Sequence, residues 1–331
     1  MRMLAAVISA PSVIEVAEFA VPSPATDEAL VKMETAAICG SDVHVLFENF
    51  ARPDAIGRPG YPGHEGVGEV IESRTARFPV GTKVLTVPPG WYGGCFAQYQ
   101  VVHEKWLLPL PPGGNRQQLL MAQQLGTTIY GLRKFWPGTA ATAATVLGAG
   151  SAGLFFLQQL RHRGFEKIIV SDLEPARLDI ARRLGATVTV LGAADAVVEA
   201  TMAATDGTGA DLVIEAAGYD VTRIQAVECA RKHGKIGYFG YPERYGLSPF
   251  PFERAYRKAV TIDFIIDTAL EPGLRSFAEA ITAVDGGDID VTYWLNEVVP
   301  LTEIATALQL ARQRGSVKVR VDLTGSPSGP A

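Results

Sequence analysis

The sequence predicts an α/β protein with a β-rich first part and a doubly wound parallel sheet after it. Three observations lead to this prediction. The first third consists of short apolar or alternating runs separated by glycine and proline. From residue 142 onward such runs alternate with helical stretches, which indicates a parallel sheet with right-handed crossovers. The length of 331 residues suits two domains of about 100–200 residues each.

The composition excludes several classes of function. Of all residues 47% are hydrophobic and 20% are charged, as in an ordinary globular protein. The formal net charge is -5 without a basic stripe, so neither a nucleic acid nor a membrane is expected as a partner. Three cysteines cannot form a disulfide framework, and an odd number fits a reducing compartment. No signal peptide or membrane-spanning run is recognised, so the cytoplasm is the expected location.

The expected strands and helices follow the chain in order. Strands are expected at 28–39, 66–73, 82–87 and 96–102, after which the proline- and glycine-rich stretch 109–115 breaks the pattern. The second part is expected to hold strands at 142–148, 167–172, 187–192, 210–218, 235–241 and 259–267, separated by helices at 151–164, 175–185, 194–205 and 221–234.

The last part of the chain carries a pair of expected helices and a closing strand at 316–323. Because the β-rich first part lacks an obvious partner, we expect this end to fold back onto it. The predicted division is therefore a first domain at 1–123, a second at 124–266, and a return of the chain to the first domain at 267–331.

A glycine-rich turn indicates a dinucleotide site in the second domain. Gly148, Gly150 and Gly153 form a G-x-G-x-x-G directly after a strand and at the start of a helix. These glycines permit a tight turn and let the backbone approach a pyrophosphate, which meets the N–H groups at the helix N-terminus.

The residue that ends the next strand indicates which dinucleotide binds. Asp172 follows Gly148 by 24 positions, close to the separation of ~20 expected for a ribose-binding acid. A carboxylate there repels a 2′-phosphate, which favours NAD over NADP, although Arg177 would soften this repulsion. The alternative is that Asp172 only caps the helix that starts near Pro175.

Two further clusters contain side chains that bind metals. The stretch "CGSDVH" places Cys39, Ser41, Asp42 and His44 within six residues, and "GHEGVG" contains His64 with Glu65. Taken singly, a cysteine is more often a small buried hydrophobe and a histidine more often an ordinary loop residue. Their occurrence together with a dinucleotide turn favours a metal centre.

These motifs show a resemblance to a known family over nearly the whole chain. With "GGCFAQYQVV", "VLGAGSAG", "GADLVIEAAG" and "GSVKVRVDL", the chain resembles the zinc-containing medium-chain alcohol and polyol dehydrogenases, and most closely their sorbitol dehydrogenase-like branch. The resemblance implies a GroES-like β-rich catalytic domain and a Rossmann domain with the doubly wound parallel sheet. It also implies NAD-linked hydride transfer at a secondary alcohol, polyol or sugar hydroxyl.

The resemblance also assigns roles to individual residues. It implies one catalytic zinc on Cys39 and His64, with Ser41 taking the alcohol proton and His44 passing it to solvent. An open zinc site lowers the pKa of bound water to about 7 and acidifies an alcohol in the same way. Asp42 is expected to support the site rather than to ligate the metal. Three residues of this chain resemble the positions that lie near the nicotinamide in the family: Thr127, Ala152 and Phe239.

The sequence departs from the family pattern at the third zinc ligand. A cysteine or glutamate is expected there, and this chain has Gln123, whose neutral amide binds zinc more weakly. Glu65 is the candidate to compensate, by ligating directly or in exchange with water. The alternative is a degenerate site without zinc. The four clustered cysteines of the family's structural zinc are also absent from the sequence, so at most one zinc is expected.

The resemblance leaves three hypotheses for function. The first is the zinc-dependent dehydrogenase, whose substrate is expected to be polar because the segment 46–61 mixes aromatic and charged residues. The second is a zinc-free quinone or enoyl reductase of the same superfold. The third is a nucleotide-binding protein with a dead metal site. Family members pair the edges of their nucleotide-domain sheets, so a homodimer or homotetramer is expected, with 260–267 as a candidate edge.

Overall fold

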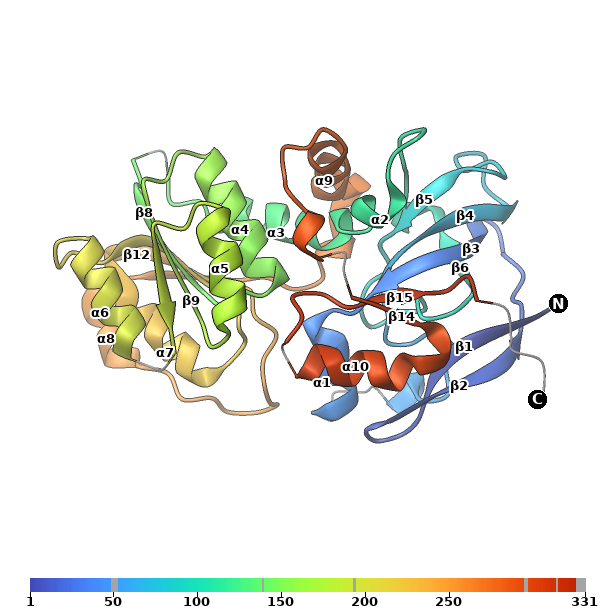
Figure 1. The fold of residues 1–331 in the computed structure, drawn as a ribbon, viewed down its shortest axis with the longest axis horizontal. Helices are drawn as coiled ribbons and strands as arrows, with labels where there is room; N and C mark the ends of the chain where they lie inside the picture. Colours follow the sequence, from blue (N-terminus) through green and yellow to red (C-terminus); the bar gives the residue numbers. More distant parts are fainter. Residues whose placement is uncertain (49–52, 139, 193–194, 295–296, 314, 326–331) are drawn as a thin grey trace. The chain divides into compact units, whose positions relative to one another are not determined.

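The computed structural model describes residues 1–48, 53–138, 140–192, 195–294, 297–313 and 315–325 (Figure 1). It divides into two compact units. The first comprises Met1–Thr127 and Asp267–Ala331, and the second comprises Thr128–Ile266. The sequence placed the two boundaries after residues 123 and 266, and the two units divide after residues 127 and 266. In the described ranges, no helix has both the length and the apolar character that crossing a bilayer requires.

The first unit is built on a seven-stranded sheet and a separate two-stranded hairpin. Its helices and strands are β1 (Arg2–Ala10), β2 (Val13–Ala20), β3 (Glu28–Ala37), α1 (Gly40–Phe47), β4 (Glu65–Ser73), β5 (Lys83–Thr86), β6 (Tyr99–His103), β7 (Leu107–Pro109), α2 (Arg116–Leu119), the start of α3 (Ala122–Phe135), α9 (Arg275–Asp285), β14 (Val298–Pro300), α10 (Ile304–Arg312) and β15 (Arg320–Asp322). The order in the sheet is β14-β15-β3-β4-β5-β7, and β6 also pairs with β3. The end of the chain therefore joins the β-rich part through β15.

The pairing of these strands determines which residues lie near the end of β3. Ala37, the last residue of β3, is paired with Glu65 at the start of β4 and with Arg320 at the start of β15. Beyond Ala37, the Ile38 N–H donates to the Val319 carbonyl at 2.9 Å. Three segments that are far apart in the sequence consequently meet at residues 38, 65 and 319.

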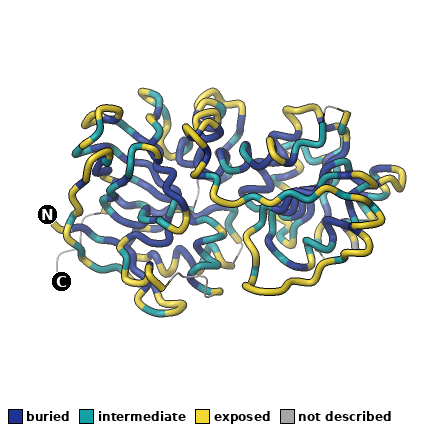
Figure 2. The backbone as a smooth tube through the Cα atoms, turned by 180° about the vertical axis from the view of Figure 1, so that it is seen from behind, coloured by how far each residue is buried: buried dark blue, intermediate teal, exposed yellow. Residues whose placement is uncertain are grey.

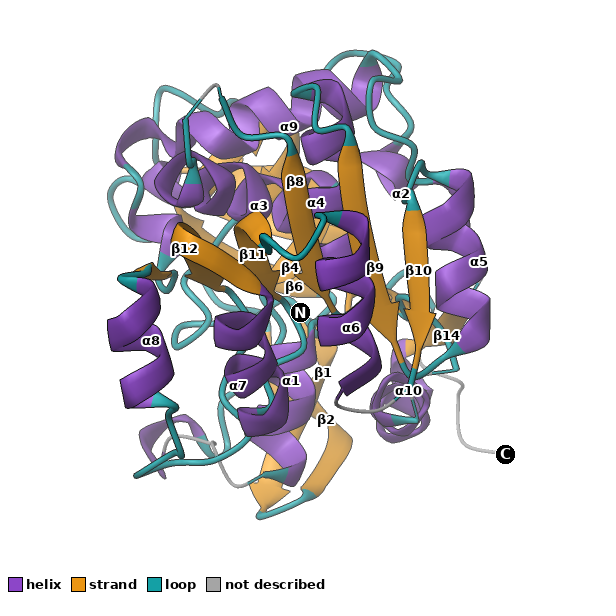
Figure 3. Cartoon of the chain, turned by 90° about the vertical axis from the view of Figure 1, so that its left-hand side faces the viewer, coloured by secondary structure: helices purple, strands orange, loops and turns teal. Residues whose placement is uncertain are grey.

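The second unit is a six-stranded parallel sheet of order β10-β9-β8-β11-β12-β13 with helices between successive strands (Figure 3). Its helices and strands are β8 (Ala143–Leu147), α4 (Ser151–His162), β9 (Lys167–Asp172), α5 (Pro175–Arg183), β10 (Val188–Leu191), α6 (Asp195–Ala204), β11 (Ala210–Glu215), α7 (Asp220–Cys229), β12 (Ala230–Tyr238), α8 (Phe252–Lys258) and β13 (Thr261–Phe264). The predicted fold class, a β-rich domain plus a doubly wound sheet, is confirmed.

Burial follows this architecture. The strands of both sheets are largely buried, whereas exposed residues concentrate in the connections (Figure 2). All five residues of β8 are buried, as expected for a central strand covered on both faces.

One predicted helix was too long. The pattern predicted a helix at 221–234, but α7 ends at Cys229 and the next residues begin β12. The Lys258 ammonium explains this end, because it donates to the carbonyls of Val227, Glu228 and Ala230 at 3.0, 2.7 and 2.8 Å. A cation that satisfies carbonyls at the end of a helix stabilises termination there.

Candidate functional site

Three predicted metal ligands lie together in the first unit. One ligand atom each from Cys39, His64 and Glu65 lies within 4.8 Å of the others. Cys39 follows β3 and precedes α1, while His64 and Glu65 stand at the start of β4, so the β3–β4 register brings them together. In the described part of the chain, this is the single cluster of three or more cysteine, histidine or acidic side chains arranged to hold a metal.

Asp42 orients two members of this cluster. Its carboxylate is fully buried, accepts a hydrogen bond from the Cys39 N–H at 2.8 Å, and lies 3.1 Å from Nδ1 of His64. A carboxylate on Nδ1 places the proton of a neutral imidazole there and leaves Nε2 as the lone-pair donor. Asp42 therefore contacts both residues and orients the imidazole of His64.

The electrostatics of the cluster favour a bound cation. Burial lowers the pKa of His64, but attraction and hydrogen bonds from Asp42 and Cys39 outweigh burial and hold that pKa well above its ordinary value. The surroundings of the imidazole are therefore arranged to receive positive charge. Thiolate sulfur and imidazole nitrogen are also the donors that zinc prefers. The residues present thus fit a zinc ion.

Glu65 has a partner that sequence reasoning missed. The Lys318 ammonium lies 2.8 Å from Oε1 and 2.7 Å from Oε2 of Glu65, and both side chains are only 1% exposed. Lys318 also donates to Oε1 of Gln124 at 3.2 Å. The one signal in the sequence was a lysine between valines in the closing strand "SVKVRVDL".

Gln123 is buried in the first turn of α3, with 4% of its surface exposed. Its neighbour Gln124 contacts Lys318, so the start of this helix belongs to the same unit and the same polar network. The hydroxyl of Thr127 donates to the Gln124 carbonyl at 2.7 Å within the helix.

The predicted proton-relay residues lie on α1. Ser41 and His44 are three positions apart, which places them on the same face of this helix, and both are partly exposed. Of the segment predicted to line the substrate side, 46–61, residues 49–52 lie outside the described residues.

The glycine turn connects β8 to α4 in the second unit. Gly148 adopts φ +99° directly after β8, a conformation that side chains rarely tolerate. A Cβ on Gly153 would lie 1.8 Å from the Gly148 carbonyl oxygen, so the helix packs too closely on the turn for any other residue. A Cβ on Gly150 would meet only Arg177, at 4.0 Å, which leaves room for a ligand. This cradle at the N-terminus of α4 fits a pyrophosphate.

Asp172 is held at the end of β9 beside this turn. It accepts hydrogen bonds from the N–H groups of Ala149 at 2.7 Å and Glu174 at 2.9 Å. Its carboxylate also lies 3.9 Å from the Arg177 guanidinium. Glu174 is the N-cap residue of α5, and its N–H donates to the Asp172 carboxylate, so Asp172 contacts both the glycine turn and the start of this helix.

The two apolar positions predicted beside the nicotinamide lie in the same unit. Ala152 is buried in the first turn of α4. Phe239 follows β12, and its ring contacts Phe156 of α4 edge to face with centroids 5.0 Å apart. Phe239 therefore packs against the helix that begins at the glycine turn.

A short turn stands where the family has its structural zinc lobe. The N–H groups of Tyr92 and Gly93 both donate to the Pro89 carbonyl. Cys95 and Cys229 are buried, and burial raises the pKa of Cys95 to about 12 and that of Cys229 to about 11. Both side chains pack within hydrophobic core clusters, and among the described residues neither belongs to the metal cluster.

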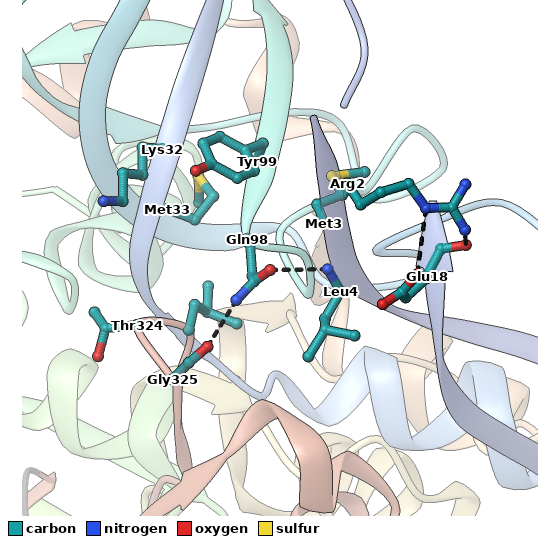
Figure 4. A pocket seen from close by; sticks show the side chains of 11 residues that line it. Arg2, Met3, Leu4, Glu18, Lys32, Met33, Gln98, Tyr99, Thr324 and Gly325 are labelled. Carbon is teal, nitrogen blue, oxygen red and sulfur yellow. Dashed lines mark hydrogen bonds and ion pairs between the residues drawn. The ribbon is translucent and has the colours of Figure 1, made fainter. Parts of the chain in front are cut away.

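A separate surface cavity in the first unit holds none of the predicted site residues (Figure 4). Gln98 lies at its centre, accepting from the Leu4 N–H at 2.8 Å and donating to the Gly325 carbonyl at 2.7 Å. These bonds connect β1 to Gly325, near the end of the described residues.

Comparisons with known proteins agree with this arrangement. Residues 25–112 match the model of the alcohol dehydrogenase GroES-like domain, and residues 152–285 match that of the zinc-binding dehydrogenases. The chain is 28% identical to the uncharacterised zinc-type alcohol dehydrogenase-like protein YdjJ of Escherichia coli, covering 93% of this chain and 95% of YdjJ. It is 26% identical to sorbitol dehydrogenase of Bacillus subtilis, covering 94% of both chains.

A solved structure shows the same fold. An E. coli oxidoreductase/dehydrogenase of unknown specificity superposes with a TM-score of 0.85 at 25% identity, covering 98% of this chain and all of that chain. The sheet of each unit, the glycine turn and the cysteine–histidine cluster agree with these matches. The chain therefore belongs to the zinc-containing medium-chain alcohol and polyol dehydrogenases.

Proposed function

We propose that the protein is an oxidoreductase with one catalytic zinc that transfers a hydride between a secondary alcohol and NAD, with a polyol or sugar as the substrate class. The observation that carries this proposal is the convergence of Cys39 and His64, with Asp42 fixing the imidazole. The relatives named above support an alcohol or polyol, and the mixed polar and aromatic segment 46–61 supports a polar one.

The proposal assigns the residues of the first unit as follows. Cys39 and His64 hold the zinc, and Gln123 and Glu65 are the two candidates to add to its ligands. A zinc ion bound there supplies Lewis acidity toward the alcohol oxygen. Ser41 takes the proton that the alcohol loses, and His44, one helical turn further along α1, passes it to solvent.

The second unit binds the nucleotide in this proposal, and the bound nicotinamide supplies the hydride acceptor. The N-terminus of α4 receives the pyrophosphate, while Ala152 and Phe239 flank the ring. The partly buried, hydrogen-bonded Asp172 supports a preference for NAD, because its negative charge opposes a 2′-phosphate. Arg177, 3.9 Å away, offsets only part of this charge.

Zinc analysis and substrate screening test the proposal together. We expect about one zinc per chain, lost in Cys39→Ser and kept in Cys229→Ser, which removes a buried thiol outside the cluster. We also expect polyol- or sugar-dependent reduction of NAD, with a lower kcat/KM for NADP. Zinc-free protein that turns over quinones or enones would establish the reductase alternative. Tight NADH binding without metal or turnover would establish the sensor alternative.

We also propose how the chains assemble, and that the protein is located in the cytoplasm. We propose a homodimer that pairs the edge strands β13, and a homotetramer is the alternative. The exposed side chains at this edge include Phe264 and Ile266. All three cysteines are free thiols, which suits the reducing cytoplasm.

A further inference from the structure

A buried glutamate at the end of β11 has no part in the mechanism proposed above. Glu215 is the last residue of this strand, and its exposed fraction is 0%. Oε1 of its side chain accepts hydrogen bonds from the N–H groups of Ala217 and Gly218 at 2.8 and 2.7 Å, and from the Thr222 hydroxyl at 2.8 Å. The side chain therefore joins the turn at 216–218 to the first turn of α7.

The turn that Glu215 holds packs against the glycine turn. A Cβ on Gly148 would lie 3.1 Å from the Cβ of Ala217 and 3.2 Å from its nitrogen. On the other side, a Cβ on Gly240 would lie 2.2 Å from the Gly218 nitrogen and 2.8 Å from Oε2 of Glu215. The turn is therefore enclosed between the glycine turn and the segment that follows β12.

The order of the strands indicates which half of a dinucleotide meets this turn. β8 lies between β9 and β11, so the direction in which successive strands are added reverses there, and a dinucleotide binds across the carboxyl ends of the strands at such a point (Figure 3). Asp172, at the end of β9, is the proposed partner of the adenosine ribose. The nicotinamide half then extends over the ends of β11 and β12, on the side of Phe239, whose N–H donates to the Glu215 carbonyl at 2.9 Å.

We propose that Glu215 is a positioning residue for the nicotinamide half of the dinucleotide, because its side chain holds the turn at 216–218 against the glycine turn. This inference rests on the proposed function and deepens its nucleotide site. The side chain acts through the turn and not on the cofactor itself, since it is wholly buried. Without it the turn could shift, and the surface offered to the nicotinamide half would shift with it.

Glu215 holds the turn as a neutral acid. Its Oε2 is buried and has no hydrogen-bond partner among the described residues, whereas Oε1 has three. A buried hydroxyl without a partner costs less than a buried ionised oxygen without one, so a proton on Oε2 fits this arrangement. Burial raises the pKa of Glu215 and outweighs the hydrogen bonds on Oε1 and the attraction of Arg223, which lower it. Glutamine, which is neutral and has the same shape, should therefore replace this residue.

Two ligands distinguish positioning from a general loosening of the fold. NADH spans both halves of the site, whereas 5′-AMP occupies the adenosine half alone. We compare the dissociation constants of both ligands, by isothermal titration calorimetry, in wild-type protein, Glu215→Leu, Glu215→Gln and Asp211→Asn. Asp211 is the matched control, because its carboxylate lies near the start of the same strand and also accepts from two backbone N–H groups and one side chain.

In Glu215→Leu the turn loses its acceptor. NADH should then bind roughly 10- to 100-fold more weakly, the size of effect that a misplacement of about 1 Å can have, and 5′-AMP should stay within about twofold of wild type. Glu215→Gln keeps an acceptor oxygen, so both ligands should bind as in wild type. Asp211→Asn should unfold more easily but keep both dissociation constants. If Glu215→Leu does not fold, Thr222→Val takes its place, since it removes one of the three donors and should weaken NADH alone, roughly two- to tenfold.

Three results would overturn the inference. The first is a folded Glu215→Leu, or Thr222→Val in its place, that binds NADH as tightly as wild type or weakens both ligands equally. The second is a Glu215→Gln protein as impaired as Glu215→Leu, because the turn would then require the charge. The third is an equal loss of NADH affinity in Asp211→Asn. Failure of the proposed function looks different, because wild-type protein would then bind no NADH, or would bind it without turning over any alcohol.

Discussion

At the scale of single residues, the metal centre depends on Asp42, which is fully buried and contacts both Cys39 and His64. Replacing it with asparagine keeps the shape and removes the charge that orients the imidazole. We expect Asp42→Asn to weaken zinc binding roughly 10- to 100-fold. Chelator competition measures this, with Asp179→Asn as a control, since Asp179 is exposed on α5. Unchanged zinc affinity in Asp42→Asn would show that this contact is unimportant to the metal.

The three cysteines should differ sharply in reactivity. Burial raises the pKa of Cys95 to about 12 and that of Cys229 to about 11, so both remain protonated thiols at pH 8. Cys39 is partly exposed. A thiol reagent at pH 8 should therefore modify one thiol per native metal-free chain rapidly, and zinc should protect it. Native Cys39→Ser should show no rapid reaction, and a second rapidly reacting thiol in wild-type protein would contradict the assignment.

Most of the candidate cluster could be predicted from the sequence because its residues occur in two short motifs. Cys39, Ser41, Asp42 and His44 lie within six positions, and their helical spacing can be derived without a structure. Lys318 could not be found this way. Its partner Glu65 is 253 positions distant, and only the pairing of β15 and β4 on either side of β3 brings them together.

At the scale of elements, the boundary between α7 and β12 depends on Lys258. Its ammonium donates to three carbonyls at the end of the helix, so Lys258→Met should leave them without this partner. We expect a loss of about 1.5–3 kcal/mol in the free energy of unfolding of the second unit, as for hydrogen bonds to a charged group. Urea titration measures the loss.

A neighbouring cation on α8 provides the comparison for Lys258. Arg254 makes an exposed ion pair with Glu228, which should contribute at most about 1 kcal/mol. Equal losses in Arg254→Met and Lys258→Met would mean that the end of α7 is determined by the sheet pairing of Ala230 rather than by the lysine.

Asp211 joins three strands of the parallel sheet and should make stability depend on pH. Burial by itself raises the pKa of Asp211, but hydrogen bonds from the N–H groups of Ala143 and Thr142 and from Arg231 outweigh it, and the pKa is lowered. A lowered pKa in the folded state stabilises the protein above the unfolded-state pKa of ~3.9, and this contribution is lost as the pH falls through the folded-state value. Asp211→Asn should therefore be less stable than wild type at pH 7.

Comparing wild type with Asp211→Asn at several pH values shows whether the charge of Asp211 stabilises the fold. The difference in unfolding free energy should shrink between about pH 4 and the folded-state pKa. Denaturation followed at several pH values measures this. A difference that stays constant down to acid pH would assign the effect to packing instead of charge.

The periodicity of the second unit made its elements predictable, since apolar strands and helices alternate there. The hairpin of β1 and β2 was not predicted. Its turn contains Ser12 at φ +61°, a conformation in which glycine or asparagine is usually found. The chain thus forms a hairpin without the local signal for one, because long-range contacts such as the Ala6 N–H to the Phe96 carbonyl fix its place.

At the scale of the whole molecule, the proposed dimer concerns the edge of the parallel sheet. β13 is the last strand at one end of the sheet order, and β10 is the last at the other. On the β13 side Phe264 is 63% and Ile266 73% exposed, although both are large and apolar. An unpaired edge with exposed apolar side chains favours pairing with another such edge. A twofold axis would allow two copies to pair β13 with β13.

Charge at this edge should prevent the assembly. We expect wild-type protein to have twice the chain mass by light scattering coupled to size-exclusion chromatography, or four times in a tetramer. Phe264→Lys combined with Ile266→Lys should give monomers, because an edge lysine must lose its hydration on pairing. Leu191→Lys places a charge at the opposite edge, where Leu191 is 56% exposed, and should keep the wild-type mass. A monomeric wild type, or a double variant that still assembles, would contradict the proposed pairing of two chains through β13.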